Sequence, residues 1–373
     1  MILFVIWLIF IILGFIFKKN RMLTFSMLFF IFILYGWSSG NADFHGYETR
    51  YQYYDSELYK SGIEIGYYLI LKFFNLVGMS FRGYMICNGL FIAVMLALTN
   101  HVAKTKVPNY VYACYMIFPL CMNVVTMRFA VASAIALLAV AIMISKFNNG
   151  TALSIILVCI SATIHVGCLF FLVFVFAERI KWKYMRIVLW CSSIVAATAV
   201  FVPKILTWIL GLLPDSSIKR VVMIRLKVAS GHYDTIDVVV MTGEILFIVL
   251  ISLYMFKVID RGLRIHGIDK SSILGTVEKY NKCMFLLVPF SVFIGDLFRV
   301  QMVMLVFTSI AVGEYLYLVG YSTNKRKVLF VDLKVLIMPI LISFCMLFLW
   351  VLRSSVNIVT VFRPLFEKNV LFY

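Results

Sequence analysis

The chain has 373 residues, of which 63% are hydrophobic and 14% are charged, and its formal net charge is +17. A single soluble core stops growing at about 250–300 residues, so this much apolar surface excludes a soluble globular protein. Apolar runs of about 18 or more residues recur along the chain without strand-like alternation. This pattern predicts an all-α polytopic integral membrane protein and argues against a transmembrane barrel. The excess of Lys and Arg over Asp and Glu, 34 against 17, is typical of basic cytoplasmic loops and requires no nucleic acid as a partner.

The first helix is predicted over residues 2–17, and we expect it to be retained because no basic residue precedes it and no A-x-A cleavage pattern follows. The basic residues directly after it, Lys18, Lys19 and Arg21, are expected in the cytoplasm, which places the N-terminus outside. A second helix over residues 22–38 returns to the outside.

The first polar island of the chain lies in residues 39–83, which we interpret as an outer loop. Within it, residues 65–80 are apolar but barely long enough to span a bilayer. If this segment crossed, Lys104 and Lys106, which follow the clear span over 84–103, would lie outside. A re-entrant or interfacial segment instead puts both lysines inside, as the positive-inside tendency favours.

Residues 108–126 lead outward again, and Arg128 opens the helix that returns. The next stretch, 151–177, is 27 residues long and apolar, with His165 near its middle. One long crossing would put the basic cluster at 178–186 outside, whereas two half-helices meeting at His165 put it inside. We therefore expect a broken helix at the outer face, buried in protein or lining a water-filled cavity.

The second half of the chain follows the same charge argument. Further crossings are predicted over residues 187–208, 238–258, 281–297, 300–320 and 335–352. An outer loop is expected over 209–237, a basic cytoplasmic loop up to residue 280, and an outer hairpin tip that holds Asp296 and Arg299. The prediction is about twelve crossings in one transmembrane domain, residues 1–373, with both termini outside.

The eight cysteines all lie in apolar segments, and no two form a CxxC pair. They are expected to pack as small hydrophobic residues, so neither a disulfide framework nor a zinc site is indicated. The chain also has no DxD pair, Walker loop or HExxH motif, so we predict no metal and no cofactor.

Arg128, Arg299 and His165 all fall on the outer side of this topology. An ionisable side chain at membrane depth costs roughly 2.5–3.5 kcal/mol, so it usually has a partner or a function. The planar fork of arginine pairs two phosphate oxygens, which makes Arg128 and Arg299 candidate ligands of a diphosphate. His165 could accept a proton or donate a hydrogen bond to phosphate or sugar. The alternatives are that Arg128 snorkels at a helix end, Arg299 pairs with Asp296, and a neighbouring helix satisfies His165.

The polar island supplies the other candidates. Asp43 and Glu64 are the nearest approach to a carboxylate pair, and either could take a proton from a sugar hydroxyl. The alternative is that both are ordinary carboxylates of a solvated loop. Tyr47 and Tyr51 are four residues apart and would share a helical face, on which they could stack on sugar rings or belong to an interfacial aromatic belt.

The order of these residues resembles a known pattern. In chain order it reads Asp43-x3-Tyr47-x3-Tyr51, Glu64-x-Gly66-Tyr67, Arg128 opening RFAVASAIALLA, Ala162-Thr163-Ile164-His165, and Arg299. This order is similar to the EpsG-like branch of the Wzy-type polysaccharide polymerases. The chain departs from that pattern after the histidine, where it has Val166 and Gly167 in place of Ser or Lys-Ser.

The resemblance implies a polymerase of O-antigen or exopolysaccharide in the bacterial inner membrane, with a fold of the GT-C kind and no metal. Such an enzyme transfers the growing glycan from undecaprenyl diphosphate to the next lipid-linked repeat unit at the periplasmic face. Negative charge develops on the departing diphosphate, so for that chemistry we expect Arg128 and Arg299 on the diphosphate, supported by His165. Glu64 or Asp43 would be the base on the acceptor hydroxyl. The expected partners are the undecaprenyl-diphosphate-linked repeat units, membrane lipid and a chain-length regulator of the Wzz type.

Other functions stay open at this point. An O-antigen ligase or a membrane acyltransferase belongs to the same lipid-linked chemistry, but the long loop at 209–237 contains only His232 and no ligase-like histidine motif. A flippase or transporter would carry out no chemistry, and transporters often show an internal repeat, which is not seen here. A purely structural scaffold does not account for ionisable residues clustered on one side.

Overall fold

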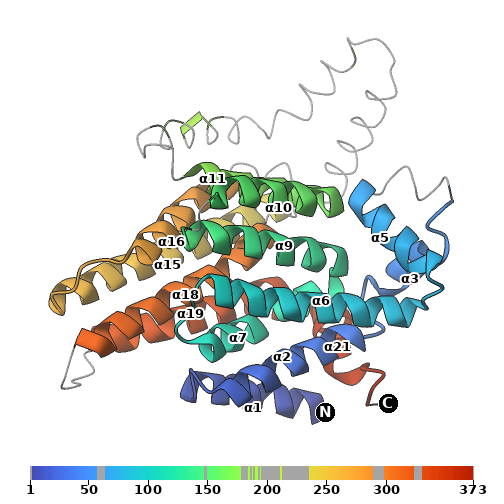
Figure 1. Ribbon diagram of the computed structural model, residues 1–373, viewed down its shortest axis with the longest axis horizontal. Helices are drawn as coiled ribbons and strands as arrows, with labels where there is room; N and C mark the ends of the chain where they lie inside the picture. Colours follow the sequence, from blue (N-terminus) through green and yellow to red (C-terminus); the bar gives the residue numbers. More distant parts are fainter. Residues whose placement is uncertain are drawn as a thin grey trace.

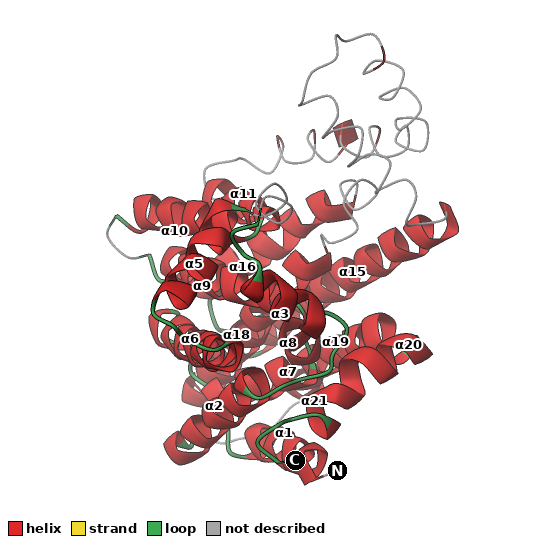
Figure 2. Cartoon of the chain, turned by 90° about the vertical axis from the view of Figure 1, so that its right-hand side faces the viewer, coloured by secondary structure: helices red, strands yellow, loops and turns green. Residues whose placement is uncertain are grey.

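The computed structural model describes residues 2–56, 64–146, 149–177, 235–288, 298–322 and 330–372, together with residues 184, 187, 190, 191, 194 and 211. These residues form helices and connecting turns without any strand, which confirms the predicted all-α class (Figures 1 and 2). The helices of the first half are α1 (Ile2–Ile16), α2 (Arg21–Gly36), α3 (Phe44–Gln52), α5 (Ile65–Leu76), α6 (Phe81–Val102), α7 (Pro108–Ile117), α8 (Leu120–Val125), α9 (Met127–Ile144), α10 (Gly150–Ile164), η1 (Val166–Phe171) and α11 (Leu172–Ala177). Those of the second half are α15 (Thr235–Ile265), α16 (Ser272–Cys283), η2 (Met284–Leu286), α18 (Phe298–Ser322), α19 (Phe330–Leu347), η4 (Phe348–Leu352), α20 (Ser355–Asn357), η5 (Ile358–Phe362) and α21 (Arg363–Glu367).

The long helices run back and forth, so their connections gather at two ends of the bundle (Figure 1). At one end, which we call the basic end, the Asn109 side chain donates to the carbonyls of Phe17, at 2.5 Å, and Asn20, at 2.9 Å. The ammonium of Lys106 lies 4.6 Å from the Tyr317 ring centre at the end of α18. These contacts bring the connections after α1 and α6 together with the end of α18.

The opposite end, which we call the site end, is built from α3 and the helix ends around it. The tail of the chain closes this end, because the backbone of Val370 donates to the Trp37 carbonyl at 2.9 Å and Ala42 donates to that of Thr360 at 3.0 Å. Both chain termini lie here, on the right of Figure 1, and Figure 2 views the bundle from this end.

Helix α9 occupies the centre of the first half, and nearly every side chain along it is buried. Its alanine-rich face allows α10 to approach closely, as small residues do between membrane helices. Two α10 serines donate to α9 carbonyls across this contact: Ser161 to Ala132 at 2.6 Å and Ser154 to Ala139 at 2.8 Å. These contacts hold α9 in place, and with it Arg128, the second residue of the helix, at the site end.

Five of the described helices are long and apolar enough to cross a membrane: Phe81–Val102, Met127–Ile144, Val240–Ile265, Phe298–Gly320 and Phe330–Leu352. Five more apolar helices are shorter, among them α5 with 12 residues. At 1.5 Å per residue, α5 is about 18 Å long, well short of the roughly 30 Å of a hydrocarbon core. The count of about twelve crossings stays a prediction.

The predicted interruption of the 151–177 stretch is confirmed. Helix α10 ends at Ile164, His165 has an extended backbone, and η1 begins at Val166. Both η1 and α11 then contact α10, so the chain folds back along the helix that it has just left (Figure 1).

Some boundaries differ from the prediction. The expected single crossing over 108–126 is interrupted at Phe118 and Pro119, between α7 and α8. The expected loop up to residue 280 instead contains α16, and the outer loop over 209–237 has α15 beginning inside it, at Thr235. The crossing over 187–208, most of that outer loop and Asp296 lie outside the described residues.

Candidate active site

A cavity of about 290 Å³ opens at the site end. It lies between α3, the start of α9, the break at His165 and the start of α18. Pockets for small ligands usually measure about 300–1,000 Å³, so this one could enclose a headgroup or part of a sugar. Its lining consists of Ala42, Asp43, Gly46, Tyr47, Arg50, Arg128, Phe129, His165 and Arg299.

One face of α3 forms the outer wall. Asp43 directly precedes the helix, and Tyr47 and Arg50 follow at intervals of four and three residues, which places them on one side. Burial is the main cause that raises the pKa of Tyr47, with Tyr67 and Asp43 adding to it, so the phenol keeps its proton. Arg50 was not among the predicted site residues. It lies three residues after Tyr47, so helical spacing alone could have indicated that the two share a face.

Arg128 is held from several sides. Its Nη1 donates to Glu64 Oε2 at 2.5 Å, and its guanidinium lies 5.7 Å from the Tyr67 ring centre. Its backbone N–H donates to Tyr47 Oη at 3.5 Å. The arginine side chain is 21% exposed and lines the cavity, so it does not snorkel along a helix end.

Glu64 therefore acts on the cavity from behind Arg128. It directly precedes α5 and does not itself line the cavity. Since the charge-assisted bond fixes one nitrogen of the guanidinium, the others keep a defined direction. The structure thus separates the two candidate carboxylates: Asp43 lines the cavity, and Glu64 holds an arginine.

His165 lies at the inner wall of the cavity. Its Nδ1 accepts a hydrogen bond from the Gly167 backbone at 3.2 Å, which leaves Nε2 to carry the ring proton. The ring meets Phe129 edge to face at 5.2 Å. Burial, and after it the charges of Arg128 and Arg299, lowers the pKa of His165 to about 3, so the imidazole is neutral at physiological pH. Gly167, at the departure from the family pattern, supplies the donor that sets this tautomer.

Arg299 enters the cavity from the first turn of α18. Its guanidinium lies 5.8 Å from the Phe129 ring centre and 5.9 Å from that of Phe298. Phe129 thus contacts both the arginine and His165. The alternative of a pair between Arg299 and Asp296 involves a residue outside the described part of the chain.

Tyr51 lies elsewhere, which corrects the prediction that it faces a sugar together with Tyr47. It is buried, its hydroxyl donates to the Met79 carbonyl at 2.5 Å, and its ring packs 5.1 Å from that of Tyr84. Four residues along a helix rotate a side chain by about 40°, and here this rotation moves it from the cavity into the core.

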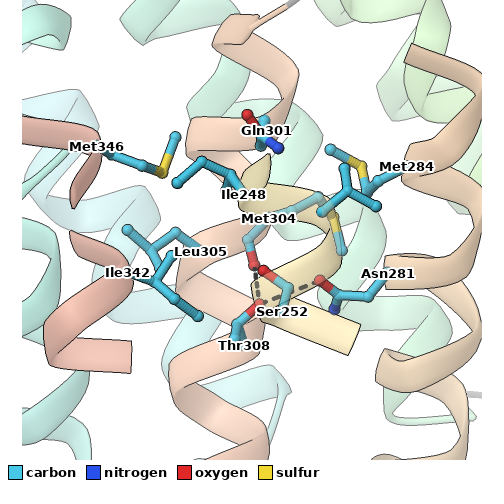
Figure 3. A pocket seen from close by; sticks show the side chains of 11 residues that line it. Ile248, Ser252, Asn281, Met284, Gln301, Met304, Leu305, Thr308, Ile342 and Met346 are labelled. Atoms are coloured by element: carbon cyan, nitrogen blue, oxygen red, sulfur yellow. Dashed lines mark hydrogen bonds between the residues drawn. The ribbon is translucent and has the colours of Figure 1, made fainter. Parts of the chain in front are cut away.

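A second, much smaller cavity lies among α15, α16, α18 and α19 (Figure 3). Asn281, Thr308 and Ser252 gather at one side of it, and Gln301 donates to the Ile245 carbonyl at 3.0 Å. Its volume is about 10 Å³, room for roughly one water molecule, so it cannot admit a sugar or a diphosphate. In the described part of the chain, His, Cys, Asp and Glu do not gather in groups of three, and we name no metal ligand.

Comparison with known proteins identifies the family. The sequence model of the EpsG family matches residues 21–361, which is most of the chain and includes every residue of the cavity. No curated protein and no solved structure gives a match. The chain therefore belongs to the EpsG family, and EpsG-like proteins are Wzy-type polymerases.

Proposed function

We propose that the protein is a polysaccharide polymerase that transfers a growing glycan from undecaprenyl diphosphate to the next lipid-linked repeat unit, as for O-antigen or exopolysaccharide. The observation that carries the proposal is the cavity at the site end, where Arg50, Arg128 and Arg299 surround a space that also holds Asp43 and a neutral His165. This arrangement suits a substrate with a strongly anionic leaving group and a hydroxyl that must lose a proton.

The arginines account for the leaving group. Negative charge grows on the diphosphate as its bond to the sugar breaks, and donors already in place stabilise that charge. Arg128 is preorganised by Glu64, and Arg299 by its aromatic neighbours. Removing one such donor from an active site costs about 2.7–4 kcal/mol, or roughly 10²–10³ in rate.

Asp43 is the better placed base, because it lines the cavity whereas Glu64 does not. In the proposed step, the acceptor hydroxyl oxygen forms a bond with the anomeric carbon of the donor glycan. Its proton passes to Asp43, and the bond from that carbon to the diphosphate oxygen breaks with its electron pair going to the lipid diphosphate. His165 supports the site by donating a hydrogen bond from its Nε2–H group to phosphate or sugar.

The charge distribution supports an outward-facing cavity. Lys18, Lys19, Lys104 and Lys106 belong to the connections at the basic end, opposite the cavity. The positive-inside rule favours a cytoplasmic location for that end, and we propose that the cavity faces the periplasm from the bacterial inner membrane. We retain about twelve crossings, a fold of the GT-C kind, a metal-independent reaction and a Wzz-type partner as parts of the same proposal.

The test is rescue of a strain that lacks its own polymerase but makes a matching repeat unit. Surface glycan is compared on gels for wild type, Arg50→Gln, Arg128→Gln, Arg299→Gln and Asp43→Asn at equal membrane levels. We expect a ladder with wild type and a single repeat unit with the variants. Lys72→Gln is the matched control, because this exposed cation lies on α5 beside the site but outside the cavity, and it should keep the ladder.

Other outcomes would overturn the proposal. A full-length ladder from Arg128→Gln would remove the diphosphate role of that residue. Absence of a ladder with wild type would refute polymerisation with that repeat unit. If a strain without the protein shows no repeat unit at all on its surface, the protein belongs to the flippase class instead.

A further inference from the structure

A third cavity, of about 370 Å³, lies at the basic end between α15 and α19. Val258, Arg261 and Ile265 line it from α15, at helical intervals of three and four residues, and Phe330, Val331 and Lys334 line it from α19. Most of this lining is apolar, and Ile265 and Phe330 are among the exposed large hydrophobic residues. It is a groove on the surface of the bundle at its basic end, at the opposite end from the candidate active site.

Each wall of the groove carries one cation, Arg261 on α15 and Lys334 on α19. The ammonium of Lys334 lies 4.5 Å from the Phe330 ring centre. The described residues that line the groove include no carboxylate. The nearest acidic residues in sequence have other partners: Asp260 accepts from Lys270 at 2.7 Å, and Asp332 accepts from Tyr315. The groove is therefore positive as well as apolar.

The walls of the groove are fixed by a buried cluster behind α19. Asp332 lies 3.0 Å from His266 Nε2, just after α15, and also accepts from Tyr315 on α18. Gly262 makes room for this cluster, because a Cβ at that position would lie 2.1 Å from Tyr315 Oη. This set of hydrogen bonds joins α18, α19 and the end of α15, so the two helices that carry the cations are held together.

We propose that this groove binds an anionic phospholipid of the membrane. Arg261 lies one turn before the end of the candidate span Val240–Ile265, at the depth where lipid headgroups begin. The phosphate would lie between Arg261 and Lys334, and an acyl chain would run along Val258 toward Tyr254. By the orientation argued from charge, this lipid belongs to the cytoplasmic leaflet.

Lipid binding to the purified protein tests the proposal without any need for polymerase activity. Dioleoylphosphatidylglycerol and dioleoylphosphatidylcholine are compared by native mass spectrometry and by the melting temperature in detergent. We expect wild type to retain phosphatidylglycerol about tenfold better or more, and Arg261→Gln/Lys334→Gln to lose that preference. The matched control is Lys257→Gln/Arg264→Gln, which removes the same charge from exposed positions of α15 outside the groove and should keep it.

An equal preference in the groove variant and the control, or no preference in wild type, would overturn the proposal. A rise in melting temperature with sodium phosphate alone, equal to the rise with phosphatidylglycerol, would assign the two cations to a free anion and would also overturn it.

Discussion

Gly66→Ala is the substitution that most sharply tests how the site is held together. Gly66 lies in the first turn of α5 against the end of α10, and a Cβ there would lie 2.2 Å from Thr163 Oγ1 and 2.8 Å from the Thr163 carbonyl carbon. The hydroxyl could rotate away, but the carbonyl carbon cannot. The second distance is about 0.6 Å inside the 3.4 Å at which ordinary contact begins, so α5 must move outward by about that much.

This displacement acts on Glu64, two residues earlier, whose carboxylate holds Arg128 at 2.5 Å. A misplacement of about 1 Å can cost 10²-fold in rate, so we expect polymer formation to fall by about tenfold or more. Overpacking should also cost about 1–3 kcal/mol of stability. Gly275→Ala on α16 is the matched control, because no atom lies within 4 Å of its added Cβ.

The assay is the rate of ladder formation in the rescue strain, normalised to the amount of protein in the membrane. A normal ladder from Gly66→Ala would refute the reasoning that α5 positions Arg128 through Glu64. If Gly66→Ala and Gly275→Ala both lowered the rate, the loss would come from adding a methyl group to a helix and not from the contact between Gly66 and Thr163.

Two further predictions concern residues around the cavity. Tyr51→Phe removes the hydrogen bond to the Met79 carbonyl, so it should lower the stability measured by thermal unfolding by about 1 kcal/mol and leave the ladder unchanged. Loss of the ladder at normal membrane levels would show that Tyr51 acts on the substrate after all. Burial, and after it the charges of Arg128 and Arg299, lowers the pKa of His165 from 6.5 to about 3 in the folded protein. The unfolded chain therefore binds a proton at a higher pH than the folded protein does. The stability that the neutral ring contributes is complete above pH 6.5 and is lost as the pH falls toward 3. The melting temperature of wild type should therefore fall more between pH 7 and about pH 5 than that of His165→Gln, and equal falls would contradict this account.

The sequence allowed the main partners of the site to be predicted because charge constrains topology. Placing basic clusters on one side brought Arg128, His165 and Arg299 to the other, and the structure places all three around one cavity. What topology cannot supply is the direction of a side chain. Tyr51 and Arg50 lie on the same helix, but one packs into the core and the other lines the cavity, and only the packing of α3 on its neighbours decides which.

The same limit applies to the boundaries of the helices. Hydropathy predicted a loop before residue 280, because the residues around Glu278 and Lys279 are charged. In the structure this segment is α16, in which Glu278 accepts from Lys270 and Lys282 while Leu274 and Val277 are buried. An amphipathic helix of this kind has too little average hydrophobicity to be found by a search for apolar runs.

The central position of α9 has a consequence for how the protein is made. A helix enters the bilayer by its own hydrophobicity and at first meets lipid on every face. In the finished protein α9 is surrounded by other helices, so lipid must be displaced from all round it as the bundle closes. Insertion requires residues that are apolar and closure requires residues that are small, and alanine, which recurs from Ala130 to Ala141, meets both requirements.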